Sequence, residues 1–110
     1  MYALLNMNQE SFLKRIEELH NQCVEIVRAK NKDYSTADDP FRNFKAPTLF
    51  GITVEKAILV RMADKISRVS VLLDKEAHVK DESLTDSLQD LANYALILAT
   101  WLESKNSQVK

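Results

Sequence analysis

The chain has 110 residues, of which 45% are hydrophobic and 28% are charged, and its formal net charge is -1. This length and composition are typical of one globular domain with a modest core, so we expect residues 1–110 to form a single domain. A protein that coats DNA usually presents a strongly basic face, and this balance of charges does not suggest one. We therefore expect no direct DNA binding.

Three further features bear on the location of the protein. No apolar run approaches the roughly 18 residues that span a bilayer, and the chain does not open with the pattern of a secretory signal peptide. The single cysteine, Cys23, excludes an internal disulfide, and His20 and His78 are too far apart in sequence to form a short metal-binding pair. We expect a cytoplasmic protein that makes no contact with membranes and keeps Cys23 reduced and buried.

We predict the first helix from about residue 9 to residue 29, with Asn8 as its N-cap. Apolar residues recur there every three or four positions, which is the spacing of one buried helical stripe. The residues of this stripe are Phe12, Ile16, Leu19, Cys23 and Ile26.

A long loop is predicted from residue 30 to residue 52, since it holds the only glycine and both prolines of the chain. Helix connections normally take about two to eight residues, so a link of this length is unusual. It also holds four of the eight aromatic residues, namely Tyr34, Phe41, Phe44 and Phe50. Two compatible interpretations remain. The loop caps one end of the bundle with its rings in the core, or it walls a pocket where rings stack on a flat ligand such as a nucleobase.

The second and third helices are predicted at about 54–75 and 82–104, followed by a frayed polar tail at 105–110. Three amphipathic helices of about 20 residues predict an all-α fold, a small bundle of three long helices. The apolar stripe of the second helix comprises Val54, Ile58, Met62, Ile66, Val69 and Leu73.

Four charged residues of the second helix, Arg61, Asp64, Lys65 and Arg68, cluster on one side. One interpretation is a solvated face with helical ion pairs, each worth about 0.2–0.5 kcal/mol. The other is a phosphate-binding surface, in which the cations neutralise a phosphate chain while nearby acids hold a metal ion.

The third helix carries Glu82, Asp86 and Asp90 at four-residue spacing, which places them within about 80° of its circumference. Carboxylate oxygens are preferred ligands of Mg²⁺, so the stripe predicts a Mg²⁺ site with these three acids as metal ligands and catalytic groups. Capping by Ser83 and the helix dipole account equally well for Glu82 and Asp86. They do not account for Asp90, which lies two turns into the helix.

Beyond Asp90 the same side of the third helix continues with Asn93, Tyr94, Ile97 and Trp101, while the main apolar stripe lies opposite. A helix that is apolar around most of its circumference needs cover on two sides. We therefore expect Asp90 to lie at the edge of a pocket or an interface. We also expect a homodimer or homotetramer, with Trp101 near the subunit interface.

Three blocks of sequence resemble the nucleotide-modification-associated domain family of bacteriophages. They are KNKDY (30–34), RMADKISR (61–68) and DESLTDSLQDLANYA (81–95). That family is more distantly similar to all-α nucleoside triphosphate pyrophosphohydrolases of the MazG and dimeric dUTPase type, which hold Mg²⁺ with helix-borne acids and release a monophosphate and pyrophosphate. The resemblance implies one site containing Asn31, Asp33, Tyr34, Asp64, Lys65, Arg68, Glu82, Asp86, Asp90, Asn93 and Tyr94.

The chain departs from the pyrophosphohydrolases on its first helix. Those enzymes carry an early Glu-x-x-Glu pair opposite a later Glu-x-x-Asp pair. Here His20 and Asn21 stand where second acids are needed after Glu17 and Glu18, and the later acids are spaced by four residues.

The expected function is Mg²⁺-dependent hydrolysis of a (deoxy)nucleotide in the cytoplasm, which for a phage protein is the host's. The alternatives are a non-catalytic helical module that binds a nucleotide or a host protein, and a structural or assembly protein. The residues expected to bind the substrate are Lys65, Arg61, Arg68, Asn31, Asp33, Tyr34, Asn93 and Tyr94.

Overall fold

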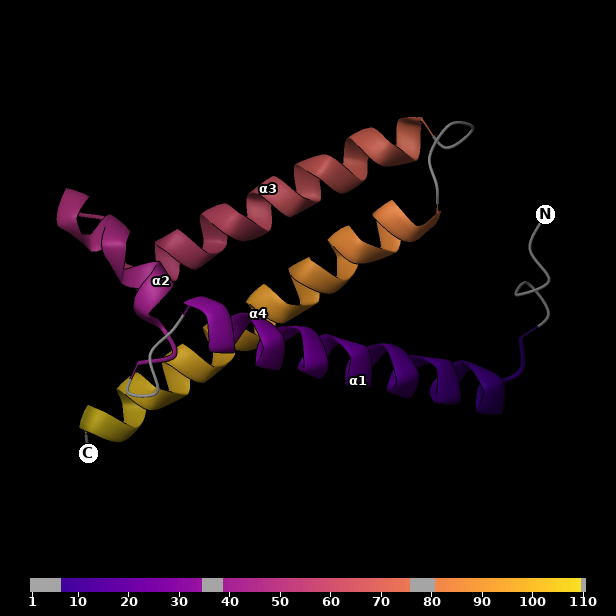
Figure 1. Cartoon of the computed structure of the whole chain (residues 1–110), viewed down its shortest axis with the longest axis horizontal. Helices are drawn as coiled ribbons and strands as arrows, with labels where there is room; N and C mark the ends of the chain where they lie inside the picture. The colour runs from indigo at the N-terminus through magenta and orange to yellow at the C-terminus, as the bar shows by residue number, and fades with distance from the viewer. Residues whose placement is uncertain (1–6, 35–38, 76–80, 110) are drawn as a thin grey trace.

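The computed structural model describes residues 7–34, 39–75 and 81–109 (Figure 1). Every regular element in these ranges is helical, which confirms the all-α prediction. In chain order the elements are α1 (Gln9–Tyr34), α2 (Arg42–Lys45), the 3-10 helix η2 (Ala46–Phe50), α3 (Val54–Asp74) and α4 (Asp81–Val109).

The long helices α1, α3 and α4 lie where three helices were expected, but two of them are longer. α1 continues from residue 29 to Tyr34, because the added residues include no glycine or proline to end it. The tail predicted to fray is helical as far as Val109. Lys105 Nζ lies 3.2 Å from Glu55 Oε1 and ties this last part of α4 to α3.

The segment between α1 and α3 is not one irregular loop, because α2 and η2 lie within it. Pro47 stands in the first turn of η2, where a missing N–H costs little. Gly51 ends η2 at φ 80°, a left-handed conformation that favours glycine. The Thr53 hydroxyl then caps α3 by accepting a hydrogen bond from the Lys56 N–H at 3.2 Å.

The core lies in the seam between α3 and α4, and α2 closes one end of it. Its buried centre consists of Phe44, Val54 and Ile58, and Ile58 has no exposed surface. The rings of Phe44 and Tyr94 meet edge to face with centroids 6.1 Å apart. Other partly buried residues packed on this centre are Met62, Ile97, Leu98 and Trp101.

Trp101 has its partners within the chain. Its indole N–H donates a hydrogen bond to the Glu55 carboxylate, and its ring lies edge to face with Phe41 at 5.1 Å between centroids. Lys45 Nζ lies 5.9 Å from the centroid of the same ring. Trp101 is therefore held by contacts within the chain, and these contacts do not test the predicted homodimer or homotetramer.

α1 crosses α4 and packs on it at the crossing, where Cys23 is buried, as expected. Its Sγ lies 4.0 Å from the Gln89 carbonyl oxygen, and the Gln89 side chain donates to the Gln22 side chain at 3.0 Å. Before this crossing, α1 extends away from the other helices (Figure 1).

Several apolar residues that were expected to be buried are about half exposed. Phe12 and Ile16 are 47% and 50% exposed because α1 has left α4 at that point. On α3, Ile66 and Leu73 are 54% and 53% exposed. No helix within the described ranges has the length and apolarity to cross a membrane.

Replacing Ile58 with alanine should lower the free energy of unfolding by about 2–5 kcal/mol, because a fully buried side chain leaves a cavity. The neighbouring Leu59 is 49% exposed, so Leu59→Ala is the matched control and should cost less than about 1 kcal/mol. Urea unfolding followed by the fluorescence of Trp101, the only tryptophan, measures both. Equal losses would contradict the placement of the core.

Trp101 fluorescence should also show an acid transition. The indole hydrogen bond, followed by the nearby Lys105, lowers the pKa of Glu55 below its ordinary value. The charged Glu55 therefore stabilises the fold above the ordinary glutamate pKa of about 4.3, and this contribution is lost as the pH falls through the lowered value. Glu55→Gln should abolish the transition, and the exposed Glu103→Gln should retain it. A transition that persists in Glu55→Gln would assign it to another group.

Candidate ligand-binding cleft

A cleft of about 1250 Å³ opens between the second half of α1, the segment around α2, and the middle of α4. Apolar side chains of α1 and aromatic side chains of the α2 segment form much of its wall, and polar groups converge on it from three long helices. The polar and aromatic residues that line it include Lys30, Asn31, Phe41, Asn43, Phe44, Arg61, Asp90, Asn93, Tyr94 and Thr100.

Asn93 is the most unusual of these residues. Its side chain is only 5% exposed, yet neither Oδ1 nor Nδ2 has a hydrogen-bond partner among the groups that the structure describes. A buried polar atom without a partner costs about 1–3 kcal/mol, and most buried polar groups in proteins are satisfied. A carboxamide in this position lacks a structural explanation within the described fold.

Asp90 joins the three long helices through two ion pairs. Its Oδ2 lies 3.0 Å from Lys65 Nζ on α3, and its Oδ1 lies 3.6 Å from Lys30 Nζ on α1. The Asp90 and Lys65 side chains are 22% and 29% exposed, so water screens the pair and its contribution to stability is modest. Two lysines and one carboxylate give this cluster a net positive charge at the edge of the cleft.

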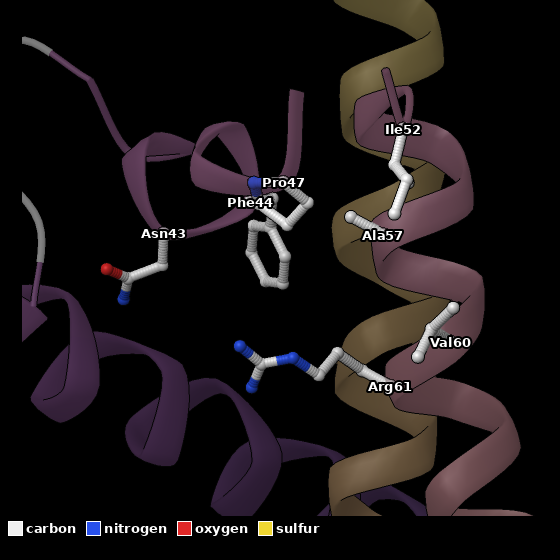
Figure 2. A pocket seen from close by; sticks show the side chains of 7 residues that line it. All are labelled: Asn43, Phe44, Pro47, Ile52, Ala57, Val60 and Arg61. Carbon is white, nitrogen blue, oxygen red and sulfur yellow. The ribbon is translucent and has the colours of Figure 1, made fainter. Parts of the chain in front are cut away.

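Arg61 reaches into the same region from α3. Figure 2 shows its side chain extending from α3 towards Asn43 and the ring of Phe44. It borders both the cleft and a smaller pocket of about 110 Å³. The guanidinium makes no hydrogen bond or ion pair with any residue within the described ranges, so its donors are available to an anion.

The cleft brings together five residues that the sequence predicted for one site: Asn31, Arg61, Asp90, Asn93 and Tyr94. Lys65 reaches it through the ion pair with Asp90. The structure leaves three others outside. Asp64 and Asp86 are exposed and do not line the cleft, and Arg68 Nε instead donates to Ser87 Oγ at 3.2 Å. The side chains of Asp33, Tyr34 and Glu82 lie outside the described part of the chain.

The described residues contain no group of three acids, histidines or cysteines that could hold a metal ion. Both carboxylate oxygens of Asp90 are paired with lysines, which compete with a cation for them. Asp86 is an isolated exposed acid one turn away, and the Glu82 side chain is not described. The described residues therefore do not form a Mg²⁺ site by themselves, and the predicted site that includes Glu82 stays a prediction.

Lys30 and Asn43 are among the cleft residues that were missed from the sequence, and a sequence signal exists for Lys30. Lys30 lies seven residues after Cys23, which is two helical turns along the same face of α1. Because Cys23 is on the face that packs on α4, Lys30 also points towards α4, where it pairs with Asp90. Asn43 stands beside the buried Phe44 in α2. Its role depends on a helix that the sequence did not predict.

Cys23 is electrostatically linked to the cleft. Burial raises the pKa of its thiol above the ordinary value, and the negative charge of Asp90 raises that pKa further. The folded protein therefore holds the less reactive thiol form to a higher pH than an unfolded chain does.

We compared the chain with known proteins. No family model matches it, and no match is found among curated proteins or among solved structures.

Removing the charge of Asp90 should lower the pKa of Cys23 and accelerate its alkylation. We expect Asp90→Asn to react a few-fold faster than the unchanged protein with iodoacetamide near pH 8.5. Asp86→Asn is the matched control on the same helix, and it should leave the rate unchanged because Asp86 does not act on Cys23. Circular dichroism would check that both variants fold equally. Equal alkylation rates in the two folded variants would contradict the coupling.

Proposed function

We propose that this protein binds a nucleotide in the cleft, with Asn93 reading the base and Arg61 holding a phosphate. The observation that carries the proposal is the buried Asn93 carboxamide, which lines the cleft and has no hydrogen-bond partner among the described residues. The free protein already bears the free-energy cost of burying these two polar atoms without partners. A ligand that forms hydrogen bonds with both atoms removes that cost, so it binds more tightly.

The carboxamide narrows the class of ligand. It offers an acceptor oxygen and a donor nitrogen side by side, and a nucleobase edge presents the complementary pair of groups. A ligand with only apolar atoms at this point would leave both groups unsatisfied. Asn93 therefore favours a heterocyclic base over an aliphatic or simple aromatic compound.

The cations supply the second part of the recognition. The planar guanidinium of Arg61 has no partner within the part of the chain that the structure describes, and its shape suits two-point contact with phosphate oxygens. Lys30 lines the cleft and is more than half exposed, at 56% of its side chain. Together these groups favour a ligand with negative charge.

The aromatic side chains complete the match. Phe41, Phe44 and Tyr94 line the cleft, and rings of this kind provide surfaces for a flat base. The cleft volume of about 1250 Å³ is ample beside the roughly 300–1,000 Å³ of typical ligand pockets. These rings support the prediction that the segment between α1 and α3 forms the wall of a pocket in which aromatic side chains stack on a flat ligand.

Hydrolysis is a separate proposal that rests on the resemblance to pyrophosphohydrolases. It requires Glu82, Asp86 and Asp90 to converge on Mg²⁺, whereas Asp90 is paired with Lys30 and Lys65. The ion pairs of Asp90 therefore favour nucleotide binding over nucleotide hydrolysis as the function of the cleft. The prediction of a cytoplasmic location, in an infected host for a phage protein, remains part of this proposal.

Asn93→Leu should separate stability from binding. Leucine has a similar size and no polar atoms, so the free energy of unfolding should rise by about 1–3 kcal/mol while nucleotide affinity falls at least about tenfold. Calorimetric titration with the common nucleoside mono-, di- and triphosphates measures the affinity, and urea unfolding measures the stability. Lower stability in Asn93→Leu would show that Asn93 has a structural partner.

Arg61→Met tests the phosphate contact, and Lys56→Met is the control on an exposed position of α3 outside the cleft. Arg61→Met should weaken the binding of nucleotides but not that of the corresponding nucleosides. Lys56→Met should change neither affinity. Titrations with Mg²⁺ and with EDTA, together with an assay for released pyrophosphate, test the hydrolytic proposal. If no nucleotide binds, a host protein becomes the better candidate partner.

A further inference from the structure

The chain exposes more surface than a compact protein of its mass. Its accessible surface is 8704 Å², whereas a compact monomer of 12.6 kDa exposes about 6,200 Å². Its radius of gyration is 16.7 Å, whereas about 13 Å is expected for a compact domain of this length. Only five hydrophobic residues among those described are buried. The fold therefore leaves a large area for a partner to cover.

The first half of α1 carries a distinct part of that surface. Phe12, Leu13 and Ile16 are 47%, 53% and 50% exposed. Phe12 and Ile16 lie within about 40° of Cys23 around the helix axis. Cys23 is 5% exposed where α1 crosses α4. The apolar stripe therefore continues from a contact within the chain onto a part of the helix that extends alone (Figure 1).

We propose that the first half of α1 is the interface of a homodimer, in which a second copy of this chain covers Phe12, Leu13 and Ile16. A two-fold axis brings the same patch of both subunits together, so one apolar stripe supplies both sides of the contact. This moves the predicted interface from the Trp101 end of α4 to α1. The proposal rests on residues of α1 outside the cleft and does not depend on the proposed nucleotide binding.

Two observations favour a second copy as the partner. The excess surface is about 2,500 Å² for one chain and therefore about 5,000 Å² for two, which is enough for the roughly 2,000–5,000 Å² that obligate homodimers bury in total. The formal net charge of the chain is only -1, so electrostatic repulsion between two copies is small.

Light scattering coupled to size-exclusion chromatography tests the proposal on the full chain. The unchanged protein should have twice the 12.6 kDa mass of one chain at micromolar concentration. Phe12→Glu/Ile16→Glu should give the monomer mass, with the dissociation constant raised at least about 100-fold by the loss of two apolar contacts. Leu49→Glu/Phe50→Glu is the control, because these residues of η2 are 83% and 82% exposed, and it should remain dimeric.

Amide hydrogen exchange of the unchanged protein keeps the test valid if the charged variant fails to fold. Residues 9–20 should exchange more slowly at high protein concentration than at low concentration, and the interior of α3 around Ile58 should not change. A monomeric unchanged protein, a Phe12→Glu/Ile16→Glu variant that stays dimeric, or concentration-independent exchange in residues 9–20 would each overturn the proposal.

Discussion

The crossing of α1 over α4 is the contact on which the described arrangement depends. Cys23 is buried there, the Gln22 and Gln89 amides bond across it, and Lys30 reaches Asp90 beyond it. α3 and α4 form their own seam around Ile58 without α1. The crossing therefore adds little to the core, but it decides where α1 can form a wall. The half of α1 that follows the crossing faces the segment around α2 across the cleft. The half that precedes the crossing extends away from the other helices (Figure 1).

Some polar residues of the cleft lower the stability of the free protein and are available to bind a ligand. A leucine in place of Asn93 would suit the packing around it, since nothing within the described ranges satisfies the carboxamide. Arg61 is likewise a charged group without a partner in the part of the chain that the structure describes. Asp90, by contrast, has both oxygens engaged and contributes to holding three helices together. The polar groups of one cleft thus divide into those that serve the fold and those that remain available to a ligand.

Much of the fold followed from the sequence because hydrophobic periodicity is local information. It placed the three long helices, and it marked Asp90 and Asn93 as the point where the polar face of α4 becomes buried. The helices α2 and η2 were missed because they are short and depend on the packing of Phe44 and the cap at Gly51. Asp86 was placed in the site by its spacing from Glu82 and Asp90 and by the family resemblance. Spacing shows that two residues share a face, but only the crossing of α1 shows which turn of that face borders the cleft.

α1 is one uninterrupted helix of 26 residues, and it connects the exposed Phe12 and Ile16 to Lys30 and Asn31 at the cleft. Its length is about 39 Å, so a rigid-body tilt of about 10° around Cys23 would displace each end by about 3 Å in opposite directions. A partner that fixed Phe12 and Ile16 through such a tilt would also change the distance from Lys30 and Asn31 to the opposite wall of the cleft. Because thermodynamic linkage is reciprocal, a ligand that drew the cleft walls together would then change the affinity of the first half of α1 for that partner by the same factor.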